Sequence, residues 1–90
     1  GGEKLFFVQT NDPTLIVKYI KIYDRWGNLV FHIDESYVAK GNESIGWEGQ
    51  EFAGRKVMPG VYVYIIETVS LLQGNNPRTE FLTGDITVIR

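Results

Sequence analysis

The sequence predicts an all-β fold, an Ig-like antiparallel β-sandwich of about seven strands. Short apolar or alternating segments recur at spacings of about 8–12 residues, and residues that favour turns separate them. Ten glycines, three prolines and twelve aromatic residues (two Trp, five Tyr and five Phe) are typical of a β protein with many turns. No stretch of helical length places apolar residues at i, i+3, i+4 and i+7. We expect a single domain over residues 4–90, preceded by residues 1–3 as a cloning remnant or a domain edge.

The first half of the chain predicts three strands. Residues 5–8 form a short apolar run, and residues 16–25 alternate between apolar and polar side chains. Gly27-Asn28 accepts the positive φ angles of a tight hairpin turn and leads into a third strand over residues 29–33. The face of the second strand that we expect to be buried carries Ile16, Ile20, Ile22 and Trp26.

The second half is expected to begin with a loop. Residues 34–46 are polar and show no countable period, which indicates a loop along the edge of a sheet. A short hairpin around Gly54 follows, and Pro59-Gly60 fits a type II turn. Residues 61–72 are apolar on both faces at their start, which predicts a central strand that is covered on both sides.

The last strand is predicted over residues 80–90. Alternation of its side chains distinguishes an inward and an outward set. The inward set is Leu82, Gly84, Ile86 and Val88, and the outward set is Thr83, Asp85 and Thr87.

Composition and charge exclude several classes of function. Nine basic and eleven acidic residues give a net charge of −2, which provides no clustered basic face for nucleic acid. The chain has no cysteine and can form neither a disulfide nor a thiolate metal site. No apolar run approaches the roughly 18 residues that a membrane span needs, so we expect no membrane insertion.

Residues with catalytic potential are few. His32 is the only histidine, and a half-buried strand residue explains it better than a metal ligand or a general base without a second His or Cys. Asp34 with Glu35, or Glu48 with Glu51, could pair their carboxylates as in glycoside hydrolysis, but nothing in the sequence brings either pair into a cleft. We therefore expect no enzyme: no catalytic residue, no metal and no cofactor.

Four tyrosines on the predicted strands leave a binding alternative open. Exposed aromatic rings on a β-sandwich can stack on sugars, which would make the chain a carbohydrate-binding or adhesive module. Core packing is the simpler interpretation, because strands favour tyrosine and a buried ring can still direct its hydroxyl to a polar partner. A plain structural spacer is a third possibility. The four residues are Tyr19, Tyr23, Tyr62 and Tyr64.

Four segments of the chain, in order, resemble a known signature. Together they are similar to the gliding-motility-associated C-terminal domain of Bacteroidota, the type B sorting domain of the type IX secretion system. The usual pattern has Asp where this chain has Glu48, and often Pro or Ala where it has Met58. The segments are residues 20–31 with Arg25-Trp26-Gly27, then Gly46-Trp47-Glu48-Gly49, then Met58-Pro59-Gly60-Val61-Tyr62-Val63-Tyr64, and residues 84–90.

The resemblance implies a non-catalytic sorting domain at the C-terminus of a larger exported protein. Cargo domains would precede it in the same chain and would cross the inner membrane by their own signal peptide. The protein would then fold in the periplasm and leave through the type IX outer-membrane translocon, whose components would be its partners, for the cell surface or the medium. The signature residues that such a translocon would recognise are Arg25, Trp26, Gly27, Trp47, Gly49, Gly60, Tyr62, Gly84 and Arg90.

The same motif residues also have structural interpretations. Trp26 is expected to pack under the hairpin turn, and Arg25 to cover an aromatic ring or to pair with a carboxylate. Trp47 is expected to plug one end of the sandwich, and Gly84 to admit a backbone or a large ring at close range. The surface left for a receptor would then be the Arg25 corner, the loop over residues 34–46 and the last strand.

Overall fold

The computed structural model describes residues 6–8, 10–34, 37–38, 45–72, 74 and 76–89, which form β-strands joined by turns. None of these residues is helical, and the all-β prediction is confirmed. Within the described ranges there is accordingly no helix with the length and apolar character to cross a membrane. The strands are β1 (Phe6–Val8), β2 (Ile16–Asp24), β3 (Leu29–Ile33), β4 (Tyr37–Val38), β5 (Ile45–Trp47), β6 (Gly60–Ser70) and β7 (Arg78–Val88).

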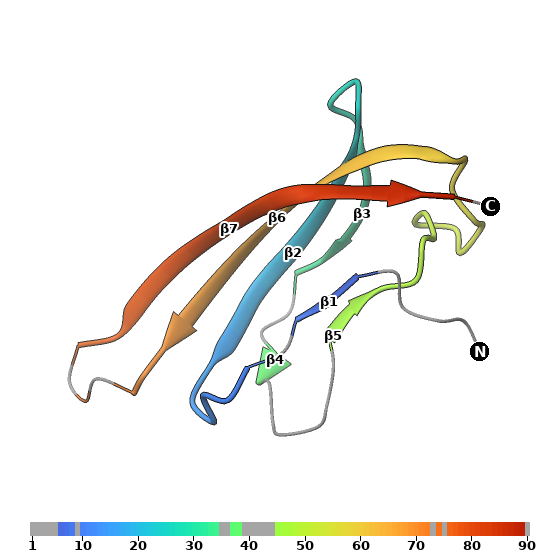
Figure 1. Cartoon of the computed structure of the whole chain (residues 1–90). Helices are drawn as coiled ribbons and strands as arrows, with labels where there is room; N and C mark the ends of the chain where they lie inside the picture. Colours follow the sequence, from blue (N-terminus) through green and yellow to red (C-terminus); the bar gives the residue numbers. More distant parts are fainter. Residues whose placement is uncertain are drawn as a thin grey trace.

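The strands form one large and one small sheet. The large sheet is antiparallel with the order β3-β2-β6-β7, and β4 pairs with the start of β2. The small sheet pairs β1 with β5, and Figure 1 shows this pair beside the large sheet, whose β6 and β7 form a long curved hairpin. The Ig-like sandwich of about seven strands is not confirmed, because the second layer consists of two strands of three residues each.

The hydrophobic core lies between the small sheet and one face of the large sheet, which we call the inner face. Trp47 of β5 is the largest fully buried side chain. Because the second layer is so short, this single ring supplies much of its buried volume. The core consists of Val8, Val17, Ile20, Ile22, Trp47, Val57, Tyr62, Ile66, Ile86 and Val88.

A register shift in β2 decides which of its side chains enter the core. The pairing of β2 with β6 shifts between Val17 and Tyr19. An extra residue at this point exchanges the two faces of the strand. Val17 is therefore fully buried, whereas Ile16 is only half-buried and the prediction for Ile16 is wrong. The prediction for Ile20 and Ile22, which follow the shift, is confirmed.

Strand β6 is central in the large sheet but is covered on one face. It pairs with β2 on one flank and with β7 on the other. Tyr62 and Ile66 are buried on the inner face, whereas Val61 on the opposite, outer face is 43% exposed. The prediction of cover on both sides is wrong for the described residues, because β1 and β5 contribute their core residues to the inner face alone.

Two connections differ from the prediction. In the predicted loop over residues 34–46, Tyr37–Val38 pairs with β2, and residues 45–46 belong to β5, which pairs with β1. Most of the remaining loop residues lie outside the described residues. Gly60 opens β6 with a φ of 153°. A type II turn would require a value near 80° at this position, and the predicted turn is therefore wrong.

The other turns agree with the prediction. Gly27, with a φ of 88°, lies in the turn between β2 and β3. Gly54, with a φ of 84°, lies in a smaller hairpin in which Gln50 pairs with Lys56. Both glycines have open space around the position of a side chain, so the positive φ alone favours glycine there.

Candidate functional site

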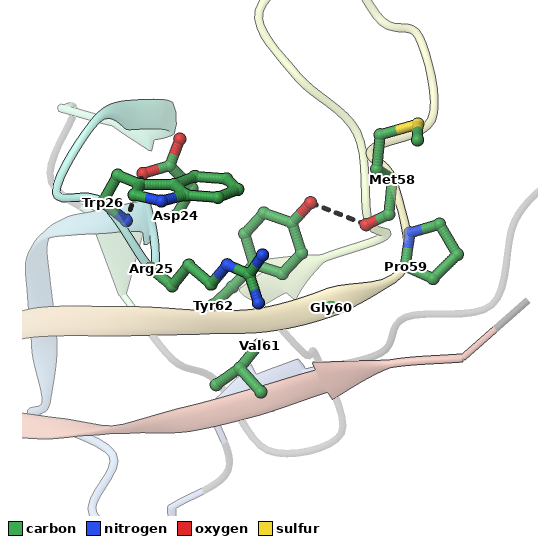
Figure 2. A pocket seen from close by; sticks show the side chains of 8 residues that line it. All are labelled: Asp24, Arg25, Trp26, Met58, Pro59, Gly60, Val61 and Tyr62. Atoms are coloured by element: carbon green, nitrogen blue, oxygen red, sulfur yellow. Dashed lines mark hydrogen bonds between the residues drawn. The ribbon is translucent and has the colours of Figure 1, made fainter.

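A cleft of about 280 Å³ lies where the turn between β2 and β3 meets the start of β6. It is lined by Asp24, Arg25 and Trp26 from the turn and by residues 58–62 from the other segment. Figure 2 shows Trp26 and Arg25 on one side and Met58 on the other. The structure thus brings two of the predicted signature segments, which are far apart in the sequence, into one place. We call it the Arg25–Trp26 cleft.

Asp24 holds the turn that carries Trp26. Its Oδ1 accepts hydrogen bonds from the backbone N–H groups of Trp26 (3.0 Å) and Asn28 (2.8 Å), and its Oδ2 accepts one from Asn28 Nδ2 (3.0 Å). The N–H of Gly27 donates to the Asp24 carbonyl at 3.1 Å. An aspartate that accepts hydrogen bonds from the backbone a few residues later fixes a tight turn. The position of Trp26 is therefore determined by the turn.

The charge of Asp24 is stabilised by the same contacts. Burial of the carboxylate by itself raises its pKa. The hydrogen bonds from Asn28, Trp26 and Gly27 favour the charged form and hold the pKa of Asp24 below its ordinary value of 3.8. The turn therefore contains a fixed anion at neutral pH.

Arg25 and Trp26 stack on each other at the rim of the cleft. The guanidinium carbon of Arg25 lies 4.4 Å from the centroid of the Trp26 ring. The predicted aromatic contact of Arg25 is therefore confirmed. The predicted burial of Trp26 is wrong, because β2 ends at Asp24 and Trp26 lies in the turn beyond it, where it is 72% exposed.

The charge of Arg25 is available to a binding partner. Among the described residues, the ion pairs join His32 to Asp34, Arg55 to Glu51 and Arg78 to Glu80, and none involves Arg25. Apolar surface lies beside this charge, since Met58 is 76% exposed and Val61 is 43% exposed. Tryptophan, arginine and methionine are enriched in the centres of protein–protein interfaces.

Tyr62 connects the cleft to the core. Its hydroxyl donates a hydrogen bond to the Met58 carbonyl at 2.6 Å (Figure 2), while its ring packs against Trp47. Trp47 is fully buried and donates a hydrogen bond from Nε1 to the Gln50 carbonyl at 2.7 Å. The burial of Trp47 that its predicted role as a plug requires is confirmed.

Two further signature residues, Gly49 and Gly84, lie away from the cleft. Gly49 is buried with a φ of 83°, and its carbonyl accepts a hydrogen bond from the N–H of Val57 at 2.9 Å. Gly84 lies under the ring of Tyr64, and a Cβ at this position would come within 2.5–2.8 Å of three ring and hydroxyl atoms. The predicted close approach at Gly84 is confirmed. Arg90 lies outside the described residues.

Of the candidate catalytic residues, the structure brings His32 and Asp34 together. Nδ1 of His32 lies 2.6 Å from Asp34 Oδ2. Glu51 forms an ion pair with Arg55, and Glu35 lies outside the described residues. In the part of the chain that the structure describes, no three histidine or acidic side chains are grouped as a metal site would require. Among these candidates the structure therefore shows a contact between His32 and Asp34 and an ion pair between Glu51 and Arg55.

The tyrosines differ from the exposed platform that sugar binding would need. Tyr62 and Tyr64 face inward, and Tyr19 and Tyr23 are half-buried on the outer face. Lys21 Nζ lies 4.8 Å from the Tyr19 ring centroid. The exposed aromatic rings among the described residues include Trp26, Phe52 and Phe81. Gly27-Asn28 was the sequence signal for the turn that exposes Trp26.

The comparison with known families agrees with this arrangement. Residues 2–84 match the family described as CHU_C Type IX secretion signal domain. The match spans both segments of the Arg25–Trp26 cleft and extends to Gly84. Searches of curated proteins and of solved structures found no significant match. The chain therefore belongs to the CHU_C type IX secretion signal domain family and has the role of a sorting signal for export.

Proposed function

We propose that this chain directs an exported cargo protein of a Bacteroidota cell through the type IX outer-membrane translocon, and that the translocon recognises the Arg25–Trp26 cleft. The cargo domains precede the chain in the same polypeptide, pass through the periplasm, and reach the cell surface or the medium. The observation that carries the proposal is the meeting of two signature segments, residues 24–26 and residues 58–62, in one exposed cleft.

Exposure of large apolar side chains in the cleft supports recognition. Trp26 is 72% exposed and Met58 is 76% exposed, so neither adds much to the buried core. Adjacent exposed apolar groups that the fold does not require are typical of interaction sites. The stability of the fold alone therefore does not explain why large apolar side chains are exposed at these two positions.

Preorganised charge supports recognition as well. Stacking on Trp26 holds the Arg25 guanidinium in place, which reduces the conformational entropy that binding would cost. The neighbouring Asp24 carboxylate is occupied by the hydrogen bonds of the turn. A partner would thus meet an ordered cation beside an apolar surface.

The composition of the cleft supports a non-catalytic role. Of the eight residues that line it, Asp24 is the only carboxylate. None of the eight is a histidine, serine or threonine. General acid–base and nucleophilic catalysis both need a second positioned group. The cleft is therefore better suited to binding than to chemistry.

An export assay tests the proposal. A fluorescent reporter with an N-terminal signal peptide would carry the chain at its C-terminus, in cells with and without the type IX translocon. The variants Arg25→Ala and Trp26→Ala should reduce export about tenfold or more while the melting temperature of the purified chain changes little. The control Arg55→Ala removes an exposed arginine from another turn, and Leu72→Ala removes an exposed apolar side chain just beyond the far end of β6.

Three results would contradict the proposal. Secretion of the wild-type reporter by cells without the translocon would exclude type IX routing. Full export of both cleft variants at unchanged stability would exclude the cleft as the recognised surface, while the routing would stand. Reduced export of the two control variants to the same extent would likewise show that the effect is not specific to the cleft.

A carbohydrate-binding or adhesive module is the second candidate function. The observation that favours it is the exposed Trp26 ring, since aromatic rings stack on sugars. Glycan arrays with the purified chain test this alternative, with the quenching of Trp26 fluorescence as a second measurement. Binding that depends on Trp26, together with reporter export that does not, would favour the module over the sorting signal.

A further inference from the structure

Strand β7 is a long edge of the large sheet. It pairs with β6 over eleven residues, from Arg78 with Ser70 to Val88 with Gly60, without a register shift. Within the described ranges no strand pairs with its other side. An edge of this kind presents a row of backbone N–H and C=O groups that only water or a further strand can satisfy.

The opposite edge of the sheet is protected, and β7 is not. The edge strand β3 has five residues, and its pairing with β2 shifts between Ile22 and Tyr23. Phe52 also packs against β3, with its ring centroid 4.9 Å from that of His32 and 6.5 Å from that of Phe31. β7 contains no proline and no lysine, which are residues that commonly block strand addition.

The side chains of β7 complete the pattern of a binding edge. Phe81 is 63% exposed and Leu82 is 42% exposed. Asp85 is exposed and has no ion pair among the described residues, whereas Arg78 and Glu80 pair with each other at 3.1 Å. Phe81 and Asp85 are four residues apart in an unshifted strand, so both lie on the outer face.

We propose that β7 accepts an added β-strand from a partner protein. The added strand carries an apolar side chain beside Phe81 and a basic side chain beside Asp85, four residues apart on the same face. Main-chain hydrogen bonds supply the affinity in this mode of recognition, and the side chains on alternate positions supply the specificity. The proposal concerns a different surface from the Arg25–Trp26 cleft and does not depend on it.

A second copy of this chain fits the edge less well. When two β7 edges pair in the antiparallel sense, outer-face residues oppose outer-face residues, so a second β7 would offer its own outer face to Asp85. That face carries no basic side chain between Arg78 and Val88. Its residues are Thr79, Phe81, Thr83, Asp85 and Thr87. Antiparallel pairing of two β7 edges therefore supplies no cation for Asp85, and we expect the cation to come from another polypeptide.

Hydrogen exchange with defined peptides tests strand addition directly. The probe is the peptide Thr-Val-Lys-Thr-Thr-Val-Phe-Lys-Thr, and its counterpart has Glu in place of the first Lys. The probe should slow exchange of amides in β7 about tenfold and leave β3 unchanged, and the Glu peptide should have a weaker effect. The variant Asp85→Lys should reverse this preference.

Proline substitutions test whether the backbone of β7 is used. In an edge strand the N–H groups of successive residues point alternately to the neighbour and to the free side. One of the two variants Leu82→Pro and Thr83→Pro therefore removes a backbone hydrogen bond to β6 and lowers the melting temperature. The other removes a backbone N–H donor from the free edge. The second variant should keep its fold and lose the exchange protection by the probe. If both fail to fold, Thr83→Lys, which adds a charge to the outer face, should lose that protection as a folded chain.

The export assay separates this proposal from the proposed function. Phe81→Lys should reduce reporter export about tenfold or more at an unchanged melting temperature, and Leu29→Lys, on the opposite edge, should not. Export that fails with the cleft variants but persists with Phe81→Lys would overturn the role of β7 in export and leave the proposed function intact. Strand addition from a partner would be overturned if neither peptide protected the amides of β7 from exchange. It would also be overturned if this protection appeared without peptide, as the concentration of the chain was raised.

Discussion

The indole of Trp47 meets the ring of Tyr62 nearly edge-on, with 5.4 Å between the ring centroids and 61° between the ring planes. The hydroxyl of the same Tyr62 donates its hydrogen bond to the Met58 carbonyl in the Arg25–Trp26 cleft. One tyrosine thus joins the largest buried side chain to the most exposed part of the site. A change in the core at Trp47 is therefore expected to reach the cleft.

The substitution Trp47→Ala should destabilise the fold severely. Removing a fully buried indole costs about 3–5 kcal/mol, which is much of the ~5–15 kcal/mol that stabilises a small domain. We expect loss of cooperative thermal unfolding and loss of export. The matched control is Trp26→Ala, which removes an exposed indole and should change the unfolding free energy by less than about 0.5 kcal/mol. Equal effects of the two substitutions would show that Trp47 does not fill the core.

The substitution Gly84→Ala should destabilise the β6–β7 hairpin through a steric clash. The new Cβ would lie 2.5 Å from the Tyr64 hydroxyl oxygen and 2.6 Å from Cζ, and such overpacking costs about 1–3 kcal/mol. Adding Tyr64→Leu shortens the side chain that clashes. Chemical denaturation of the two single variants and of the double variant should therefore give a total loss smaller than the sum of the single losses. Additive losses would exclude the contact as the cause.

Asp12 should make stability depend on pH in the acid range. The hydrogen bonds from the Ser70 hydroxyl and then from Thr14 hold the pKa of Asp12 below its ordinary value of 3.8, against the opposing effect of burial. Because the folded pKa is the lower one, the unfolded chain binds more protons between the two values. The contribution of Asp12 is complete above about pH 4 and is lost as the pH falls through the folded pKa.

The variants Asp12→Asn and Ser70→Ala test this dependence. Asp12 joins two distant segments, since it accepts hydrogen bonds from the N–H (2.8 Å) and hydroxyl (2.6 Å) of Thr14 and from the Ser70 hydroxyl. Melting curves from about pH 5 to about pH 2 should fall less steeply for both variants than for the wild type. Three parallel curves would mean that the carboxylate contributes nothing in this range.

The substitution Asp24→Ala should loosen the position of Trp26. It removes the acceptor of two backbone N–H groups and of the Asn28 side chain. Fluorescence anisotropy of Trp26, measured in a Trp47→Phe background, should fall, and export should decrease more than the melting temperature. The control Asp34→Ala removes a carboxylate near the end of β3 and should leave the anisotropy unchanged.

Features that depend on neighbouring residues could be predicted from the sequence. The hairpin at Gly27-Asn28 needs a positive φ, and Gly27 provides it. Alternation in β7 correctly placed Ile86 and Val88 in the core, because a strand without a register shift keeps a period of two. The close approach at Gly84 likewise follows from the lack of a side chain.

Features that depend on long-range pairing could not be predicted. The register shift at Val17 exists only in the pairing with β6, and no local pattern marks it. The apolar alternation of β2 continues to Trp26, although the strand ends at Asp24. The cleft itself follows from the pairing of Asp24 with Tyr62, which joins two segments that the sequence keeps apart.

The central position of β6 has a consequence for how the chain folds. Ile20 pairs with Ile66, and Phe6 pairs with Trp47. Strand β1 and one flank of β2 therefore find their partners only across about 40 or more residues of chain. Closing such loops costs entropy and slows folding. A chain that stopped before residue 60 would leave Ile20 and Ile22 without the strand that covers their flank, open to proteases and to aggregation. Folding of this domain therefore requires that synthesis has continued through β6.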